Sequence, residues 1–433
     1  MILSGLRVLE FTIAWAGPLA GRFLADLGAE VVHLEHASSR GVGTTGVGGF
    51  RASEEIGDWK WGDLPGPVFR SGVYPDADPG EHPWNRQGMF NKMQRNKLSL
   101  CMDVKTPEGH DALIELIKVS DIVLDNFSPR GIRGMGLDWE SLKEINPRLI
   151  RVSLSGYGHT GPDQMRVSWG PNLESHSGMA AMTGYTDSDA PMKLGPAMPD
   201  PIGGLSATVA MLAALKQRDE TGEGMFIDLS QFESFGSIGG ELYLSASITG
   251  TAPERHANRS PDRAPQGLYR CLGDDEWIAI SVEDDAEWAA LAGVLGGAVD
   301  GGDMYASLAG RIEHHDELDE TITAWTSSRT KFDAMHELQA AGVRAGAVMT
   351  NKEIVEDEHL AARGFMVDID AIDVGVRSYP GFPIHFEDPA EIPMVGSPPL
   401  GHDNAKVLSE WLGYSPERIR ELEASGVLAD TAA

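Results

Sequence analysis

The chain has 433 residues, of which 42% are hydrophobic, so we expect a folded protein of roughly two or three domains. A formal net charge of −30 argues against nucleic acid as a partner, and no apolar run reaches the ~18 residues of a membrane-spanning helix. The N-terminus lacks the features of a secretory signal, so we expect a cytoplasmic protein that binds neither nucleic acid nor membrane.

The first third of the chain alternates short apolar runs with amphipathic segments. Helices are predicted at residues 17–27 and 107–119, with Thr106 as the N-cap of the second, and strands at 6–11, 30–34, 98–102, 122–124 and 149–154. Strands that alternate with helices indicate a mostly parallel sheet covered on both faces. Residues 38–90 predict a long loop, in which Trp59, Trp61 and Trp84 would be packed anchors.

Two segments, 41–46 and 156–161, match the letters GxGxxG but lack the strand, turn and helix that a dinucleotide site requires. In the second segment, Pro162 and Asp163 interrupt the chain before any helix. The cysteines Cys101 and Cys271 lie far apart and without metal-ligand spacing. We therefore expect no nicotinamide, no metal and no tightly bound cofactor.

Asp200 lies in the segment Pro199-Asp200-Pro201-Ile202-Gly203-Gly204, just ahead of the apolar run 205–215. Asp is a preferred N-cap and Pro a preferred first helical residue, so the pattern predicts a helix capped by Asp200. The helix dipole would keep the carboxylate ionised, and the glycines would let a ligand approach the backbone. This setting suits a carboxylate nucleophile, and it equally suits a plain N-cap.

The later part of the chain predicts a second α/β unit. A strand at 225–229 and a long helix from about 230 lead into a linker at 251–265, then strands at 267–271 and 277–282 and helices near 284–296 and 316–342. Ser415-Pro416-Glu417 opens a last helix. We assign residues 1–225, completed by about 385–433, to a large domain, and 226–384 to linkers and a small α/β domain.

Several short blocks run in order through nearly the whole chain, among them Arg95-Asn96-Lys97-Leu98-Ser99-Leu100, Asp125-Asn126-Phe127-Ser128-Pro129 and Pro398-Pro399-Leu400-Gly401-His402. In these blocks the chain resembles the class III CoA-transferases, the family of formyl-CoA transferase, carnitine CoA-transferase and α-methylacyl-CoA racemase. The resemblance implies a Rossmann-like large domain with a parallel sheet, a smaller α/β domain, and two chains interlocked as a dimer.

The resemblance also implies the chemistry. In the family's transferases an aspartate attacks the acyl-CoA carbonyl and later carries CoA as a thioester, and Asp200 matches that aspartate. The implied function is CoA transfer from an acyl-CoA, such as succinyl-CoA, to a carboxylic acid, with coenzyme A and its acyl thioester as substrates. Positions that match the family's CoA contacts are Trp15, Ala16, His36, Met102, Lys105, Asn126 and Phe127, and Arg133 adjoins a family arginine position occupied by Gly134.

Two alternatives stay open: a CoA-binding subunit of a heteromeric transferase, and an acyl-CoA racemase or isomerase. At the positions of the racemases' second base and its neighbouring carboxylate, this chain has Trp169 and Gly170. This argues against two-base racemisation. Glu174, about one helical turn beyond Gly170, either replaces that carboxylate or is a surface residue of the helix. The acceptor acid is open, although the altered pocket points away from formate or oxalate, and a homodimer or a heteromer would both fit.

Overall fold

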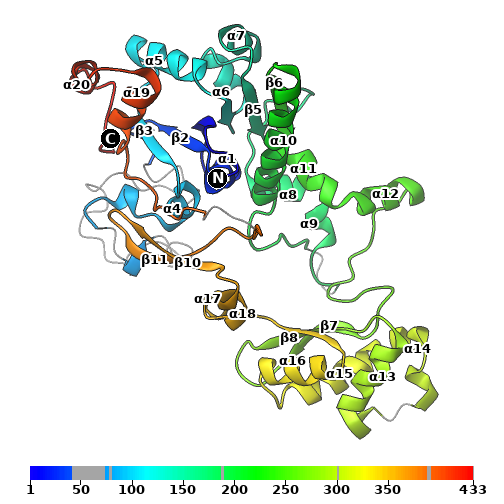
Figure 1. Ribbon diagram of the computed structural model, residues 1–433. Coiled ribbons are helices and arrows are strands. Elements are labelled where there is room, and N and C mark those ends of the chain that lie inside the picture. Colours follow the sequence, from blue (N-terminus) through cyan, green and yellow to red (C-terminus); the bar gives the residue numbers. More distant parts are fainter. Residues whose placement is uncertain (41–73, 78–79, 187–189, 300–301, 388–391, 433) are drawn as a thin grey trace. The chain divides into compact units, whose positions relative to one another are not determined.

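The computed structural model describes residues 1–40, 74–77, 80–186, 190–299, 302–387 and 392–432. These residues form two compact units (Figure 1). The first comprises Met1–Ser177, Leu194–Gly240 and Ala361–Ala433, and the second comprises Gly178–Lys193 and Glu241–Leu360. The segment 178–193 thus belongs to the second unit although it interrupts the first in sequence. No helix among the described residues is long and apolar enough to cross a membrane.

The first unit is built on a six-stranded sheet in the order β3-β2-β1-β4-β5-β6, and every neighbouring pair is parallel. Its strands are β1 (Arg7–Phe11), β2 (Glu30–Glu35), β3 (Leu98–Cys101), β4 (Ile122–Asp125), β5 (Ile150–Ser155) and β6 (Met225–Ser230). This confirms the parallel α/β sheet expected from the sequence. Because the strand order reverses between β1 and β4, the connections that follow these two strands diverge and open a crevice at the carboxyl edge.

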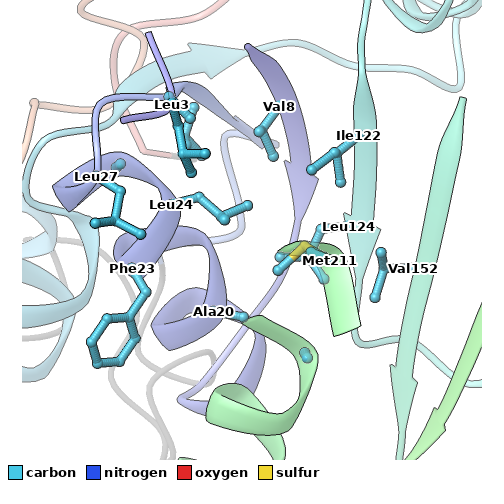
Figure 2. Packing of buried hydrophobic residues seen from close by; sticks show 14 of the residues in the cluster. Leu3, Val8, Ala20, Phe23, Leu24, Leu27, Ile122, Leu124, Val152 and Met211 are labelled. Atoms are coloured by element: carbon cyan, nitrogen blue, oxygen red, sulfur yellow. The ribbon is translucent and has the colours of Figure 1, made fainter. Parts of the chain in front are cut away.

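Helices cover both faces of this sheet because successive strand residues point to opposite sides. Val8 packs in the layer of α1 and α10, whereas its neighbour Leu9 packs in the layer of α5 and α19. Figure 2 shows Leu24 of α1 and Met211 of α10 meeting the strand residues Val8 and Val152. The helices of this unit are α1 (Ala16–Asp26), α4 (Gly88–Gln94), α5 (Pro107–Lys118), α6 (Pro129–Gly134), α7 (Trp139–Ile145), α8 (Gly170–His176), α10 (Pro199–Thr221), α11 (Gln231–Ile238), α19 (Asn404–Leu412) and α20 (Pro416–Ala424).

Several local predictions for the first unit are confirmed. The hydroxyl of Thr106 accepts the backbone N–H of Gly109 at 3.1 Å and caps α5. Trp84 is buried, whereas Trp59 and Trp61 lie outside the described residues. A two-stranded antiparallel ribbon, β10 (Met366–Ala371) with β11 (Gly375–Pro380), has no counterpart in the sequence-based prediction.

The second unit has a three-stranded antiparallel sheet in the order β7-β8-β9, packed on helices through residues such as Ile278, Ile280 and Leu291. Its strands are β7 (Gln266–Arg270), β8 (Trp277–Ser281) and β9 (Arg344–Ala347), and its helices include α9 (Met179–Met182), α12 (Gly240–Thr249), α13 (Asp285–Leu295), α14 (Leu308–Glu313), α15 (His315–Thr326), α16 (Lys331–Ala340), α17 (Asn351–Val355) and α18 (Glu358–Ala362).

Two helices predicted from the sequence are each divided into two shorter helices in the structure. The segment 316–342 breaks between α15 and α16, where the Thr330 hydroxyl accepts the N–H of Asp333 at 3.1 Å and starts a new helix. The helix from about 230 divides into α11 and α12 at Gly239. In both cases local capping and glycine outweigh the continuous apolar pattern.

The predicted N-cap at Asp200 is also wrong. Helix α10 begins at Pro199, two residues earlier than predicted, and Met198 occupies the N-cap position without a side-chain hydrogen bond. Asp200 therefore lies inside the first helical turn. Pro201 fits there as well, because the first four N–H groups of a helix have no partner within the helix.

Helix α10 packs on α1 with a backbone-close contact at Gly204. A Cβ atom placed on Gly204 would lie 2.7 Å from the carbonyl oxygen of Ala16 and 3.2 Å from the side chain of Leu19. Only glycine permits this approach. The contact holds the start of α10 against the start of α1.

Gly204→Ala is expected to lower the free energy of unfolding by about 1–3 kcal/mol, because the added methyl must push α10 away from α1. Gly134→Ala is the matched control: Gly134 ends α6, and a Cβ there would meet no described atom within 4 Å. The control should be neutral or stabilising by up to ~1 kcal/mol. Urea denaturation of both variants measures this, and equal midpoints would contradict the close contact.

Candidate active site

Asp200 is held by contacts from two other helices. Its Oδ1 atom accepts a hydrogen bond from Nε2 of Gln231 at 3.1 Å. Gln231 is the first residue of α11, directly after β6, and its side chain is buried. On the other side, a Cβ atom built on Gly170 would come within 2.2 Å of Oδ2 of Asp200. The missing side chain at Gly170 therefore makes room for the Asp200 carboxylate.

Burial raises the pKa of Asp200 from 3.8 to about 6, while the hydrogen bond from Gln231 opposes this rise. The carboxylate is thus mostly ionised at neutral pH yet poorly solvated. A partly desolvated anion held by one neutral donor is a more reactive nucleophile than a solvated one. The geometry agrees with the nucleophilic role predicted for Asp200, which remains a prediction.

Glu174 is fully buried in α8, so its reading as a surface residue is wrong. Its Oε1 atom accepts the backbone N–H of Leu194, and among the described residues Oε2 has no hydrogen-bond partner. Glu174 therefore fixes the position of the backbone at Leu194, a few residues before α10 begins. A direct contact with substrate, in place of a carboxylate at Gly170, stays a prediction.

A cavity of about 300 Å³ opens at the carboxyl ends of β1, β2, β3 and β4. Four of the predicted CoA contacts line it: His36, Met102, Lys105 and Phe127. They come from three different connections that follow β2, β3 and β4. The crevice expected where the strand order reverses is thus a real cavity, and four CoA positions predicted from sequence meet in it.

The other predicted CoA residues lie around this cavity in different ways. The side chain of Asn126 bonds both the N–H and the carbonyl of Ile13, at 2.9 and 2.8 Å, and so shapes the cavity wall. Trp15 occupies the N-cap position of α1, and Ala16 opens that helix, beside Gly204. Arg133 is exposed in α6 and is not among the described residues that line the cavity.

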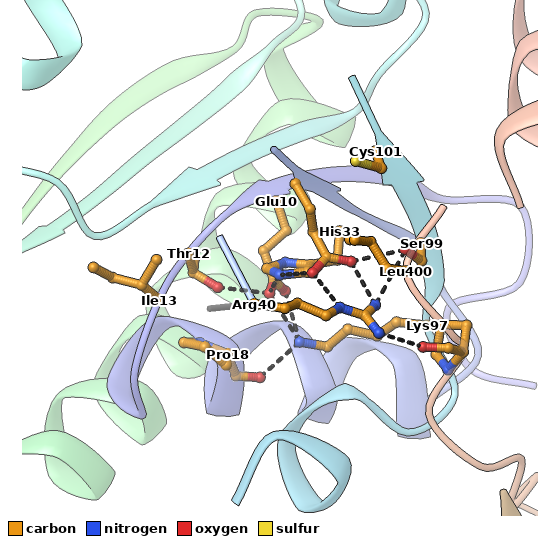
Figure 3. Close-up of polar contacts among 12 residues, drawn as sticks. Glu10, Thr12, Ile13, Pro18, His33, Arg40, Lys97, Ser99, Cys101 and Leu400 are labelled. Atoms are coloured by element: carbon orange, nitrogen blue, oxygen red, sulfur yellow. Dashed lines mark hydrogen bonds and ion pairs between the residues drawn. The ribbon is translucent and has the colours of Figure 1, made fainter. Parts of the chain in front are cut away.

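A cluster of buried charges, formed by Glu10, His33, Glu35, Arg40 and Lys97, lies beside the cavity, and sequence reasoning missed it (Figure 3). Nζ of Lys97 donates to both oxygens of Glu10 at 2.9 Å, and the guanidinium of Arg40 donates to both oxygens of Glu35 at 2.6 Å. Nδ1 of His33 lies 3.1 Å from Glu10. The cluster is not apparent in the sequence because it joins residues that are distant along the chain, such as Lys97 and Glu10, which are 87 residues apart.

The cluster keeps its carboxylates charged although they are buried. Burial opposes ionisation of Glu10, but Lys97 and His33 more than offset it and lower the pKa of Glu10. Arg40 and His33 act in the same way against the burial of Glu35 and lower its pKa. His33, Glu35 and Arg40 also line the cavity, so these ion pairs form a fixed polar wall.

The sequence matches the profile of CoA-transferase family III over residues 3–404. The chain belongs to CoA-transferase family III. As a family III CoA-transferase it is an enzyme that acts on CoA thioesters.

Named relatives cover almost the full length of this CoA-transferase. It is 30% identical to the succinyl-CoA–D-citramalate CoA-transferase of Chloroflexus aurantiacus, over 98% of both chains. It is 31% identical to the succinate–glutarate CoA-transferase of Agrobacterium fabrum, over 94% of this chain and 95% of the relative. It is 28% identical to the beta subunit of a succinyl-CoA–L-malate CoA-transferase of C. aurantiacus, over 98% of both.

A solved structure agrees with this family III fold. The crystal structure of a CaiB/BaiF family protein from Brucella suis is 28% identical, with a TM-score of 0.78, and covers 94% of this chain and 98% of that one.

Lys105→Ala is expected to raise the Kd for CoA about 1.4- to 5-fold, since a solvent-exposed contact with a phosphate is worth ~0.2–1 kcal/mol. The effect should shrink in high salt, which screens exposed charges. Lys118→Ala, at the opposite end of α5, is the matched control. Isothermal titration calorimetry with CoA measures the Kd of both variants. An equal change in Kd for both substitutions would exclude a local contact at Lys105.

Asp200→Asn is expected to stabilise the folded chain by about 1–3 kcal/mol near pH 8. A carboxylate whose pKa is raised by folding destabilises the folded state above that pKa, and this cost fades as pH falls from about 6 towards 3.8. Urea denaturation at pH 8 and pH 4.5 should therefore show a gain that shrinks at the lower pH. Asp219→Asn, exposed on the same helix, should show no such gain; a destabilised Asp200→Asn at pH 8 would refute the buried charge.

Proposed function

We propose that the chain moves CoA from succinyl-CoA to a carboxylic acid larger than formate, through covalent intermediates on Asp200. The observation that carries this proposal is the buried Asp200 carboxylate, with one oxygen bonded to Gln231 and the other against Gly170. The names of the relatives, with succinyl-CoA or succinate paired with D-citramalate or glutarate, support the donor and an acceptor of similar size.

The proposed reaction begins when Oδ2 of Asp200 attacks the thioester carbonyl of the donor and releases the CoA thiolate. The product is a mixed anhydride of Asp200 and the donor acid. The thiolate then attacks Cγ of Asp200, which releases the donor carboxylate and leaves an aspartyl-CoA thioester. The acceptor carboxylate repeats both steps in reverse order and leaves as its CoA thioester.

The residues at the positions of the racemases' second base favour this reaction over racemisation. Proton transfer at an α-carbon needs an acid–base group on each face of the substrate. The positions of that second base and its neighbouring carboxylate are Trp169 and Gly170 in this chain. Neither residue can exchange a proton at neutral pH.

We also propose a dimer as the working form, with CoA and a carboxylic acid as the small-molecule partners and the cytoplasm as the location. The surface of helix α12 supports the proposal of a partner chain. No described side chain of that helix is buried, and Leu244 and Ile248 are 61% and 75% exposed. Such an apolar surface is typical of interfaces. A heteromer is the second candidate, and the relative that is itself a beta subunit favours it.

The test is the intact mass of the purified chain after mixing with succinyl-CoA, beside Asp200→Asn. A covalent CoA adduct is expected on the native chain alone, because only Asp200 supplies the carboxylate that carries CoA. Hydroxylamine should remove the adduct and leave a hydroxamate at position 200.

The same mixtures separate the alternatives. An adduct on both proteins would place the nucleophile elsewhere. If neither protein forms an adduct but CoA still binds, the proposal is wrong, and the chain is either a CoA-binding subunit of a heteromeric transferase or an acyl-CoA isomerase. Screening dicarboxylic acids for CoA transfer by the native chain then identifies the acceptor.

A further inference from the structure

The two oxygens of Asp200 have different surroundings. Oδ1 is bonded to Nε2 of Gln231 at 3.1 Å, whereas Oδ2 lies against the backbone of Gly170, which has no side chain. An aspartate that must act as nucleophile and then as electrophile uses its oxygens for different tasks. The arrangement around Asp200 assigns these tasks.

We propose that Gln231 is a catalytic residue whose side-chain N–H stabilises the oxyanion that forms on Oδ1 when Cγ of Asp200 is attacked. This inference rests on the proposed covalent reaction. Oδ2 is then the oxygen that attacks the donor carbonyl, and Oδ1 is the oxygen that stays a carbonyl throughout.

The atoms balance in each step. When Oδ2 attacks the donor, the new C–O bond forms, the C–S bond breaks and the pair of electrons leaves with the CoA thiolate, so the oxyanion of this step is on the donor. When the thiolate attacks Cγ, the negative charge moves onto Oδ1, and collapse of that intermediate expels the donor carboxylate together with Oδ2. Gln231 therefore acts in the second step and in the mirrored attack of the acceptor, both of which occur at Cγ.

The structure holds Gln231 in place for this task. Its backbone opens α11 under a cap in which the Ser230 hydroxyl accepts the N–H of Glu233 at 3.2 Å, and only 8% of Gln231 is exposed. A Cβ on Gly203 would lie 2.9 Å from Cγ of Gln231, so this glycine leaves space for the amide chain beside Asp200. A fixed, neutral donor in a buried site needs little reorganisation when charge develops.

The amide also suits both states of Asp200. It donates to a carboxylate, a thioester carbonyl or an oxyanion, and it has no proton to lose in this pH range. A lysine in its place would form an ion pair and weaken the nucleophile, and a glutamate would repel the oxyanion. Glutamine therefore stabilises the charge at Oδ1 without quenching Oδ2.

The experiment compares native chain, Gln231→Leu and Gln231→Glu, with Ser234→Ala as control on the same helix. Two rates are measured with succinyl-CoA: exchange of isotopically labelled CoA into the donor, which reports only the first step, and formation of the CoA adduct, which reports attack at Cγ. In both Gln231 variants adduct formation should fall about 10²–10³-fold, as for loss of one oxyanion donor. Label exchange should fall far less, and the control should match the native chain in both.

A role in folding or in placing Asp200 would reduce both rates together, and that outcome overturns the inference, as does an unchanged rate of adduct formation. Gln231→Glu keeps the shape of the side chain, so it serves if Gln231→Leu does not fold. Absence of any adduct on the native chain would overturn the proposed function itself, whereas a native adduct with equal losses in both steps overturns only the assignment of Gln231.

Discussion

The site depends on the close contact between α1 and α10 at Gly204. Helix α1 follows the loop that lines the cavity, and Asp200 lies in the first turn of α10, so the distance between these helices sets the distance between cavity and carboxylate. Because the carbonyl of Ala16 touches the backbone of α10, no side chain intervenes that could change its rotamer. Backbone contacts of this kind position groups more rigidly than contacts between long side chains.

The buried charges beside the cavity also hold its wall rigid, although removing charged groups from water costs free energy. Replacing such pairs by apolar residues often costs nothing, so their presence is poor evidence of stability. Their arrangement is better explained by what they join: Arg40 also donates to the carbonyl of Pro398, and the Ser99 hydroxyl accepts the N–H of Gly401. The cluster thereby links β2 and β3 to the segment before α19 and keeps polar groups at fixed positions along the cavity wall.

Much of the fold followed from the sequence, because strands of a buried parallel sheet are continuous apolar runs and helix starts carry caps. Thr106 is one such start, and four of the positions that the resemblance predicts to contact CoA line a single cavity, although their contact with CoA stays a prediction. The sequence did not reveal Gln231, although it did carry a weak signal: a polar residue directly after a strand, at the carboxyl edge where sites form. Its contact with Asp200 exists only because α11 folds back on α10, and no periodicity encodes that.

The pairing of Glu174 with Leu194 has a consequence for how this chain can vary. The segment 178–193 departs from the first unit and returns to it, and the hydrogen bond between Glu174 and Leu194 joins residues on either side of that departure. A hydrogen bond therefore connects the two ends of the segment 178–193. Insertions or deletions within it should leave α8 and α10 in register, so relatives can diverge in length there without disturbing the carboxylate that follows.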